Sequence, residues 1–346
     1  MDHRLRAALA RGARHTSPFP QAQRDGLGAR ILSSAVFFAV GTGLMLHAGQ
    51  MLLRELRQPR DRAGAARGTL FRPLPARIDG LGTAAAQLSA DRSAAAGGDL
   101  YDVIATEHGV RVVMGDVRGH GIGATGTVAA VLGSFREAVH DEEELSCVLR
   151  RLERSLARHL RERATTGPHS DSPAAEEFVT VLLLEIRRDG ETRALNCGHP
   201  WPFLLSEGHA QLLVGTEPLP PLGPFPLPAE LPYADCGRLR PGEALFLHTD
   251  GVTDARDGHG RFFPLPAVLA EAVRADPISP QAVLRAVVAQ LLRHTGGRPA
   301  DDVAVLVLSN DRQARRAPSG ARDGDTCGSA AGARPATTNP QPTNCQ

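Results

Sequence analysis

Short apolar runs separated by turn residues dominate the chain from about residue 75 to residue 310. Residues 110–114 predict a strand, and the apolar run at 178–186 predicts a buried strand. Other strand-like runs lie at residues 192–196, 201–205, 210–214, 243–248 and 303–308. Several of them are separated by Gly, Asn and Pro at hairpin-like distances, so the pattern predicts a largely antiparallel sheet.

Helical periodicity appears in three segments. Residues 125–139 read as a helix that follows a Gly-rich turn. Ser279 and Pro280 are a good N-cap and first-turn pair for a helix through Leu292. The third segment has one apolar stripe at three- and four-residue steps, made of Leu145, Val148, Leu149, Leu152, Leu156 and Leu160. We expect that stripe to belong to the core.

The N-terminal part of the chain differs in amino-acid composition. Residues 1–30 are rich in Arg, and residues 31–53 contain few strongly polar side chains. A helix needs about 20 apolar residues to cross a bilayer, so we expect 31–53 to be a transmembrane anchor and 54–74 a linker. A signal sequence, a buried helix and a vestigial segment are the alternatives. Arginines flank the segment on both sides and leave its orientation open.

The C-terminal part has its own composition. Residues 311–346 lack Leu, Ile, Val and Phe, so they cannot bury a core, and we predict a disordered tail. Seven prolines between Pro218 and Pro232 predict a stiff surface connection rather than a regular strand. The remaining segment, 75–310, is the predicted folded domain.

Charge and composition exclude several function classes. Arginine supplies all 39 basic residues, against 38 acidic ones, and the net charge is +1. Such a balance gives no overall field for nucleic acid. The absence of lysine excludes a Schiff-base mechanism and a phosphate-binding loop of the lysine type.

Four acidic motifs stand where predicted strands meet loops. They are GGDLYD (97–102), GDVRGHG (115–121), HTDGVTDAR (248–256) and PADD (299–302). Carboxylates without thiolates select hard divalent ions such as Mg²⁺ or Mn²⁺. A pair of such ions can bind a phosphoryl group and activate water. Each motif alone is weak evidence, because Asp-Gly is most often a turn.

In their order and spacing these motifs resemble the metal-dependent serine/threonine phosphatases of the protein phosphatase 2C (PPM) class, in particular its bacterial SpoIIE-like branch. NCGHPWPFLL (196–205) and DDVAVLVL (301–308) extend the resemblance over about residues 80–310. The resemblance implies an α+β fold, a four-layer α-β-β-α sandwich of two antiparallel sheets flanked by helices. It also implies two Mn²⁺ or Mg²⁺ ions at one edge of the sandwich.

Carried over by position, the resemblance makes Asp116 and Asp250 the catalytic metal ligands. Asp99, the Val117 carbonyl oxygen and Asp301 complete the implied metal set. Arg118 stands where eukaryotic relatives have a histidine, so the general acid stays unassigned. Asp102 and Asp254 lie near the acidic motifs, and we expect them to orient ligands or waters. For the other neighbours the default interpretation is a role outside the metal set: Tyr101, His120, Cys197, His199 and Asp302.

The predicted function is hydrolysis of phosphoserine or phosphothreonine in a protein. By analogy, the substrate resembles a phosphorylated anti-anti-sigma factor. A catalytically weak membrane-tethered interaction domain and a phosphohydrolase of a small phosphate ester are the alternatives. We expect the chain at the cell membrane, attached through residues 31–53 with a cytoplasmic catalytic domain, or else free in the cytoplasm.

Overall fold

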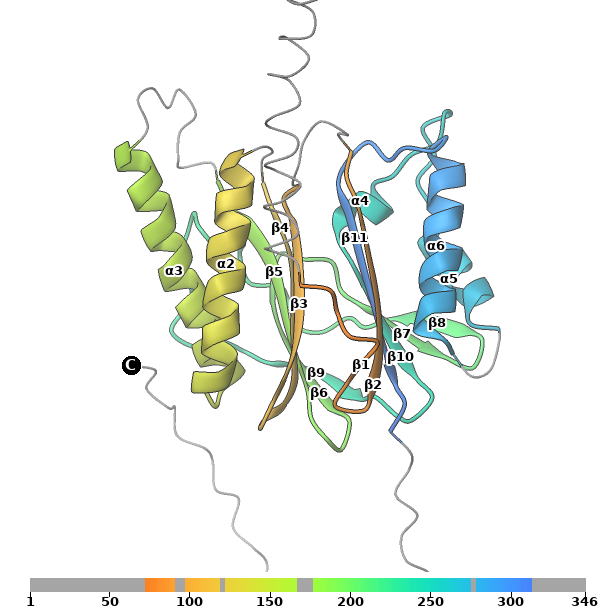
Figure 1. Ribbon diagram of the computed structural model, residues 1–346, viewed down its shortest axis with the longest axis horizontal. Coiled ribbons are helices and arrows are strands. Elements are labelled where there is room, and N and C mark those ends of the chain that lie inside the picture. The colour runs from red at the N-terminus through yellow and green to blue at the C-terminus, as the bar shows by residue number, and fades with distance from the viewer. Residues whose placement is uncertain (1–71, 91–96, 119–121, 167–176, 275–277, 313–346) are drawn as a thin grey trace, which may run out of the picture. The chain divides into compact units, whose positions relative to one another are not determined.

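The computed structural model describes residues 72–90, 97–118, 122–166, 177–274 and 278–312. In this part of the chain two antiparallel sheets face each other, and helices cover the outer face of each sheet (Figure 1). The four-layer α-β-β-α sandwich expected from the sequence is therefore confirmed.

The first sheet has five strands in the order β3-β4-β5-β6-β9. Their bounds are Asp99–Thr106 (β3), Gly109–Val117 (β4), Val179–Ile186 (β5), Glu191–Cys197 (β6) and Ala234–Arg238 (β9). Its outer face is covered by two long helices, Ile122–Asp141 (α2) and Leu145–Thr166 (α3) (Figure 1).

The second sheet has six strands in the order β1-β2-β11-β10-β7-β8. Their bounds are Arg77–Ile78 (β1), Leu81–Leu88 (β2), Phe203–Ser206 (β7), His209–Leu212 (β8), Ala244–His248 (β10) and Val303–Asn310 (β11). Its helices are Asp250–Thr253 (α4), Leu265–Ala272 (α5) and Pro280–His294 (α6). Of these, α5 and α6 form the outer layer (Figure 1).

Alternate residues of the central strands enter different cores. In β11, Ala304, Leu306 and Leu308 pack between the sheets, whereas Val303 and Val305 pack against the helices. Because both faces of such a strand are buried, its sequence is an unbroken apolar run rather than an alternating one. The leucine stripe of α3 is buried as predicted, including Leu149 and Leu152.

The structure corrects two local expectations. Asp250 does not lie in a β-turn but begins the short helix α4, with Thr249 at the N-cap position. The proline-rich segment is not purely a surface connection, since Leu222 is fully buried and bridges to Val179 in β5.

No helix in the described ranges is long and apolar enough to cross a membrane. The predicted anchor at 31–53 and nearly all of the predicted tail lie outside the residues that the structure describes.

Candidate active site

The two sheets bring acidic residues together at one end of the sandwich. Asp99 at the start of β3 pairs directly with Asp116 near the end of β4. The second sheet contributes Asp250, which follows β10, and Asp301 and Asp302, which precede β11. Because β10 and β11 are antiparallel neighbours, the end of one lies beside the start of the other. All four acidic motifs of the sequence thus supply carboxylates to one place.

Glycines allow this close approach. A Cβ atom on Gly98 would collide with both the Val117 carbonyl oxygen and Oδ1 of Asp116. A Cβ atom on Gly97 would collide with the Asp302 carboxylate. The two glycines of GGD are therefore needed for space, and the two oxygen atoms beside Gly98 face the same small volume.

Thr249 connects the sheets at the buried side of the cluster. Its hydroxyl donates to Oδ2 of Asp99 at 3.0 Å and accepts from the backbone N–H of Ala304 at 2.9 Å. Thr249 is 0% exposed and Asp99 is 1% exposed. This bond fixes the Asp99 carboxylate from the opposite sheet.

A second threonine holds the backbone of Asp116. The Asp116 N–H donates to Oγ1 of Thr180 at 3.2 Å, and that hydroxyl lies 3.0 Å from Nδ1 of His199. Asn196 in turn receives the His199 N–H at 2.8 Å. Burial lowers the pKa of His199 to about 3, so its imidazole is neutral at physiological pH. His199 therefore has the structural role expected from the sequence.

Each carboxylate of the cluster disfavours the ionised form of its neighbours and so raises their pKa values. Burial, followed by repulsion from Asp250 and Asp301, raises the pKa of Asp116 to about 7. Burial and the Asp116 charge raise the pKa of Asp99 well above its usual range. The pKa of Asp250 is raised by burial and then by Asp301. Like charges this close favour protonation unless a cation compensates them.

The donor set fits a hard divalent cation. Carboxylates and one backbone carbonyl oxygen are the ligands that Mg²⁺ and Mn²⁺ prefer, and the space that a Cβ atom on Gly98 would fill is bounded by two such oxygens. Among the described residues, however, no three His, Cys, Asp or Glu side chains already form a metal-binding group. The residues therefore have the ligand atoms that the metal prefers and lie near one another, but their side chains are not arranged as a complete coordination shell.

Other residues singled out from the sequence have separate roles. Asp102 forms an ion pair of 2.7 Å with Arg136 of α2. Asp254 caps α4 through its N–H to the Asp250 carbonyl oxygen. Cys197 is buried, which raises the pKa of its thiol to about 12 and makes it a poor nucleophile. Tyr101 packs against the core between the sheets.

His120 lies outside the residues that the structure describes. The neighbouring carboxylates of Asp301 and Asp302 differ in their contacts. Oδ1 of Asp302 accepts the N–H of Ala90 at 3.0 Å, so this side chain ties a loop to the site. Asp301 is exposed and accepts the Asp302 N–H at 2.8 Å. Among the described residues, Asp301 is therefore the more exposed of the two carboxylates.

Sequence reasoning missed Thr180 and Thr249. Thr249 directly precedes Asp250 in the TDG motif, so its position was the available signal. Thr180 lies inside an apolar run, where nothing in the sequence relates it to Asp116.

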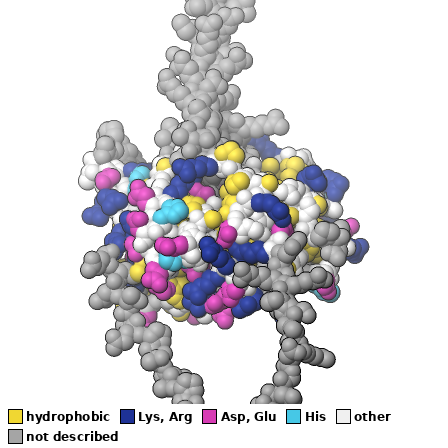
Figure 2. All heavy atoms as spheres, turned by 60° about the horizontal axis from the view of Figure 1, so that its bottom comes forward, with side chains coloured by type: hydrophobic (Ala, Val, Ile, Leu, Met, Phe, Trp, Pro, Cys, Tyr) yellow, Lys and Arg dark blue, Asp and Glu magenta, His cyan; other side chains and the backbone are white. Residues whose placement is uncertain are grey.

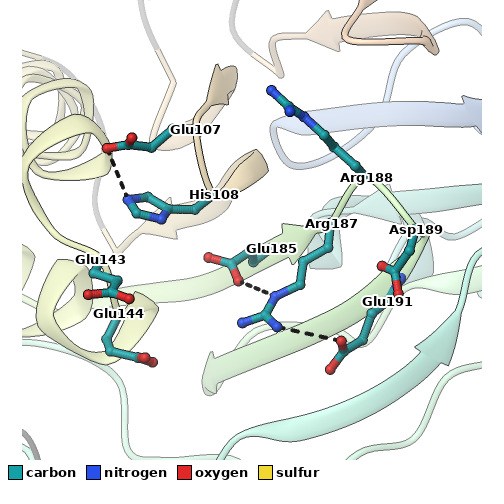
Figure 3. Close-up of a pocket in the computed structure, with 9 residues that line it drawn as sticks. All are labelled: Glu107, His108, Glu143, Glu144, Glu185, Arg187, Arg188, Asp189 and Glu191. Atoms are coloured by element: carbon teal, nitrogen blue, oxygen red, sulfur yellow. Dashed lines mark hydrogen bonds and ion pairs between the residues drawn. The ribbon is translucent and has the colours of Figure 1, made fainter.

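A cavity of about 440 Å³ lies at the other end of the sandwich, near the β3–β4 turn. Figure 3 shows its acidic and basic side chains, with Arg187 paired to Glu185 and Glu191 at 3.2 and 3.6 Å. Figure 2, with the lower end of Figure 1 turned forward, shows both charge signs interspersed on this side of the molecule. The buried Arg111 pairs with Glu185 at 2.8 Å and donates to the carbonyl oxygens of Val139 in the last turn of α2 and Glu143 just after it. The ion pairs of Arg111 and Arg187 with Glu185 stabilise the fold at this end.

The comparison with known families decides the class of this protein. A family model described as stage II sporulation protein E (SpoIIE) matches residues 106–311 of the 346. The chain belongs to the SpoIIE family. The SpoIIE-like match proposed from the sequence is thereby confirmed.

Solved structures support the fold. The RsbU and RsbW domains of a Mycobacterium tuberculosis protein are 25% identical, with a TM-score of 0.52 over 66% of this chain and 60% of that one. The SiaA-PP2C domain of Pseudomonas aeruginosa is 19% identical, with a TM-score of 0.58 over 75% and 98%. The phosphatase domain of SpoIIE from Bacillus subtilis, solved with a fragment of its regulatory domain, is 15% identical, with a TM-score of 0.50 over 66% and 62%. The chain therefore matches about three fifths of the first and third of these chains.

Proposed function

We propose that this SpoIIE-family protein hydrolyses phosphoserine or phosphothreonine in a protein and requires two Mn²⁺ or Mg²⁺ ions. The observation that carries the proposal is the convergence of Asp99, Asp116 and Asp250 from two sheets, each with a raised pKa. A protein keeps such mutually repelling carboxylates together where a cation binds.

Asp99, Asp116, Asp250, Asp301 and the Val117 carbonyl oxygen would hold the ions. Bound divalent ions supply activated water and neutralise the charge of a phosphoryl group. The chain's own part is positioning. Thr249 orients Asp99, and Thr180 fixes the Asp116 backbone through the hydrogen bonds given above. Asp116 lies in a strand of one sheet and Asp250 follows a strand of the other, so both sheets would contribute ligands.

For the substrate we propose a phosphorylated regulatory protein of the anti-anti-sigma type. The similarity to a Mycobacterium tuberculosis chain that carries RsbU and RsbW domains supports this class. We also propose attachment to the membrane through residues 31–53, with the catalytic domain in the cytoplasm, where such phosphoproteins occur.

The test is a metal titration of the purified full chain. We expect a phosphothreonine peptide and a phosphorylated anti-anti-sigma domain to be hydrolysed only with added Mn²⁺ or Mg²⁺, and chelator to abolish turnover. Full turnover in a metal-free preparation would contradict the proposal. If the protein hydrolyses small phosphate esters but neither the phosphopeptide nor the phosphorylated domain, the small-ester alternative is favoured. No turnover of any substrate with metal bound would favour an interaction domain.

A further inference from the structure

A groove of about 510 Å³ lies between α3 and the segment Gly223–Pro226. One wall is formed by side chains of α3, among them Arg154, Arg158 and Arg161. The other wall is Pro224, Phe225 and Pro226. The groove is separate from the acidic centre and has no part in the chemistry described above.

The helix wall carries positive charge. The three arginines are spaced by four and three residues, so they lie along one side of α3. Glu153 is the acidic residue that lines the groove, and its carboxylate accepts the Leu227 N–H at 2.5 Å. That hydrogen bond holds the acid at the base of the opposite segment. The groove therefore has an excess of positive charge and complements an acidic ligand.

The proline wall carries an exposed aromatic ring. The Phe225 side chain is 66% exposed. It is one of four large hydrophobic side chains that are exposed in the described part of the chain. The segment around it is fixed, because Leu222 bridges to both Val179 and Phe225. Arg150 of α3 also donates to the carbonyl oxygens of Pro228 and Ala229 at 2.7 and 2.6 Å. An exposed aromatic side chain on a fixed backbone is a typical anchor for a protein partner.

Residue contacts link the groove to the strand that carries the expected metal ligands. Gly223, with φ of +122°, packs against the backbone of Glu177 and Phe178. The Arg118 guanidinium lies over the Phe178 ring, with its Cζ 5.2 Å from the ring centroid. Arg118 directly follows Val117 and is exposed. A continuous path of contacts thus joins the groove to the metal-ligand strand.

We propose that the groove binds an acidic segment of the phosphorylated protein substrate, next to the residue that is dephosphorylated. The proposal rests on the phosphatase function proposed above and adds a substrate class, phosphoproteins with acidic flanks. Arg158 and Arg161 bind the flanking carboxylates, and Phe225 packs against the peptide.

The experiment compares two phosphothreonine peptides on the full chain, one with Asp and Glu flanks and one with Asn and Gln in their place. Turnover of p-nitrophenyl phosphate is measured for every variant as the reference. We expect R158E/R161E to lower the ratio of acidic-peptide kcat/KM to reference kcat/KM roughly tenfold, because two favourable ion pairs become repulsive. The change should lie in KM, and the milder R158Q/R161Q should fall between. The control R285E/R293E, on exposed positions of α6, should keep the wild-type ratio.

Fluorescence anisotropy of the labelled acidic peptide gives a readout independent of turnover. We expect weaker binding to R158E/R161E, and weaker binding to all proteins at higher salt. Equal binding and equal ratios in wild type and R158E/R161E would overturn the groove proposal. Tighter binding of a single-stranded oligonucleotide than of the acidic peptide would also overturn it. An enzyme inactive on every substrate would contradict the proposed phosphatase function, and the anisotropy would still decide the groove.

Discussion

The Thr249 hydroxyl donates a hydrogen bond of 3.0 Å to Asp99, joining a residue after β10 of one sheet to the first residue of β3 in the other. The same hydroxyl accepts the Ala304 N–H at 2.9 Å. The position of the buried carboxylate therefore depends on a side chain that is not itself an expected metal ligand.

Replacing Thr249 with Val should weaken metal binding about tenfold and destabilise the domain by about 1–3 kcal/mol, because a buried carboxylate and a buried N–H lose their partner. Calorimetric metal titration and thermal unfolding measure the two effects. Thr249→Ser, which keeps the hydroxyl, is the control and should stay near wild type. Unchanged metal affinity in the Val variant would mean that this bond does not position Asp99.

Asp250→Asn should lower metal affinity and reduce phosphopeptide turnover by orders of magnitude while the fold persists. The substitution keeps the volume but removes the charge that a hard cation requires. The matched control is Asp254→Asn, four residues later at the end of the same helix. If Asp250→Asn titrates metal as the wild type does, Asp250 is only a helix-start residue.

Gly98→Ala should abolish metal binding, because the added Cβ would occupy the space between the Val117 carbonyl oxygen and Asp116. Gly133→Ala is a suitable control, since a Cβ there meets nothing within 4 Å. In helix α2 that change should be neutral or stabilising by up to about 1 kcal/mol. Normal metal affinity in Gly98→Ala would show that the two oxygens do not share a ligand.

The metal-free protein should lose stability as the pH rises from about 4 to about 7. The pKa of Asp116 is raised to about 7 in the folded state, so folding favours its protonated form. That contribution is complete below the unfolded-state pKa and is lost as the pH passes the folded-state value.

Thermal unfolding in chelator at pH 5 and pH 8 measures this dependence. Asp116→Asn should flatten the profile and stabilise the metal-free protein at pH 8. Added Mn²⁺ should restore stability to the wild type but not to the variant. A wild-type profile that rises toward pH 8 would contradict the repulsion within the cluster.

Deleting residues 1–60 should move the protein from the membrane fraction to the supernatant without loss of turnover, because the SpoIIE-family match begins at residue 106. Fractionation of cells that express each form, with activity measured in both fractions, is the test. Recovery of the intact chain entirely in the supernatant would refute the anchor.

The sequence alone determined the elements whose signal is local. The apolar runs of β5 and β11 and the leucine stripe of α3 specify those elements because burial on one or both faces fixes residue types at a regular period. β2 was not predicted, since its sequence LGTAAAQL has little intrinsic strand propensity. It becomes a strand through an eight-residue pairing with β11.

The acidic motifs showed which carboxylates matter, but only the tertiary structure decided how they meet. Asp99 lies beside Asp116 because of the register of β3 and β4, and both approach Asp250 because the two sheets stack. Thr180 and Thr249 acquire their roles through contacts across strands and sheets. Such contacts leave no periodic pattern in one chain, because they depend on distances between residues far apart in sequence.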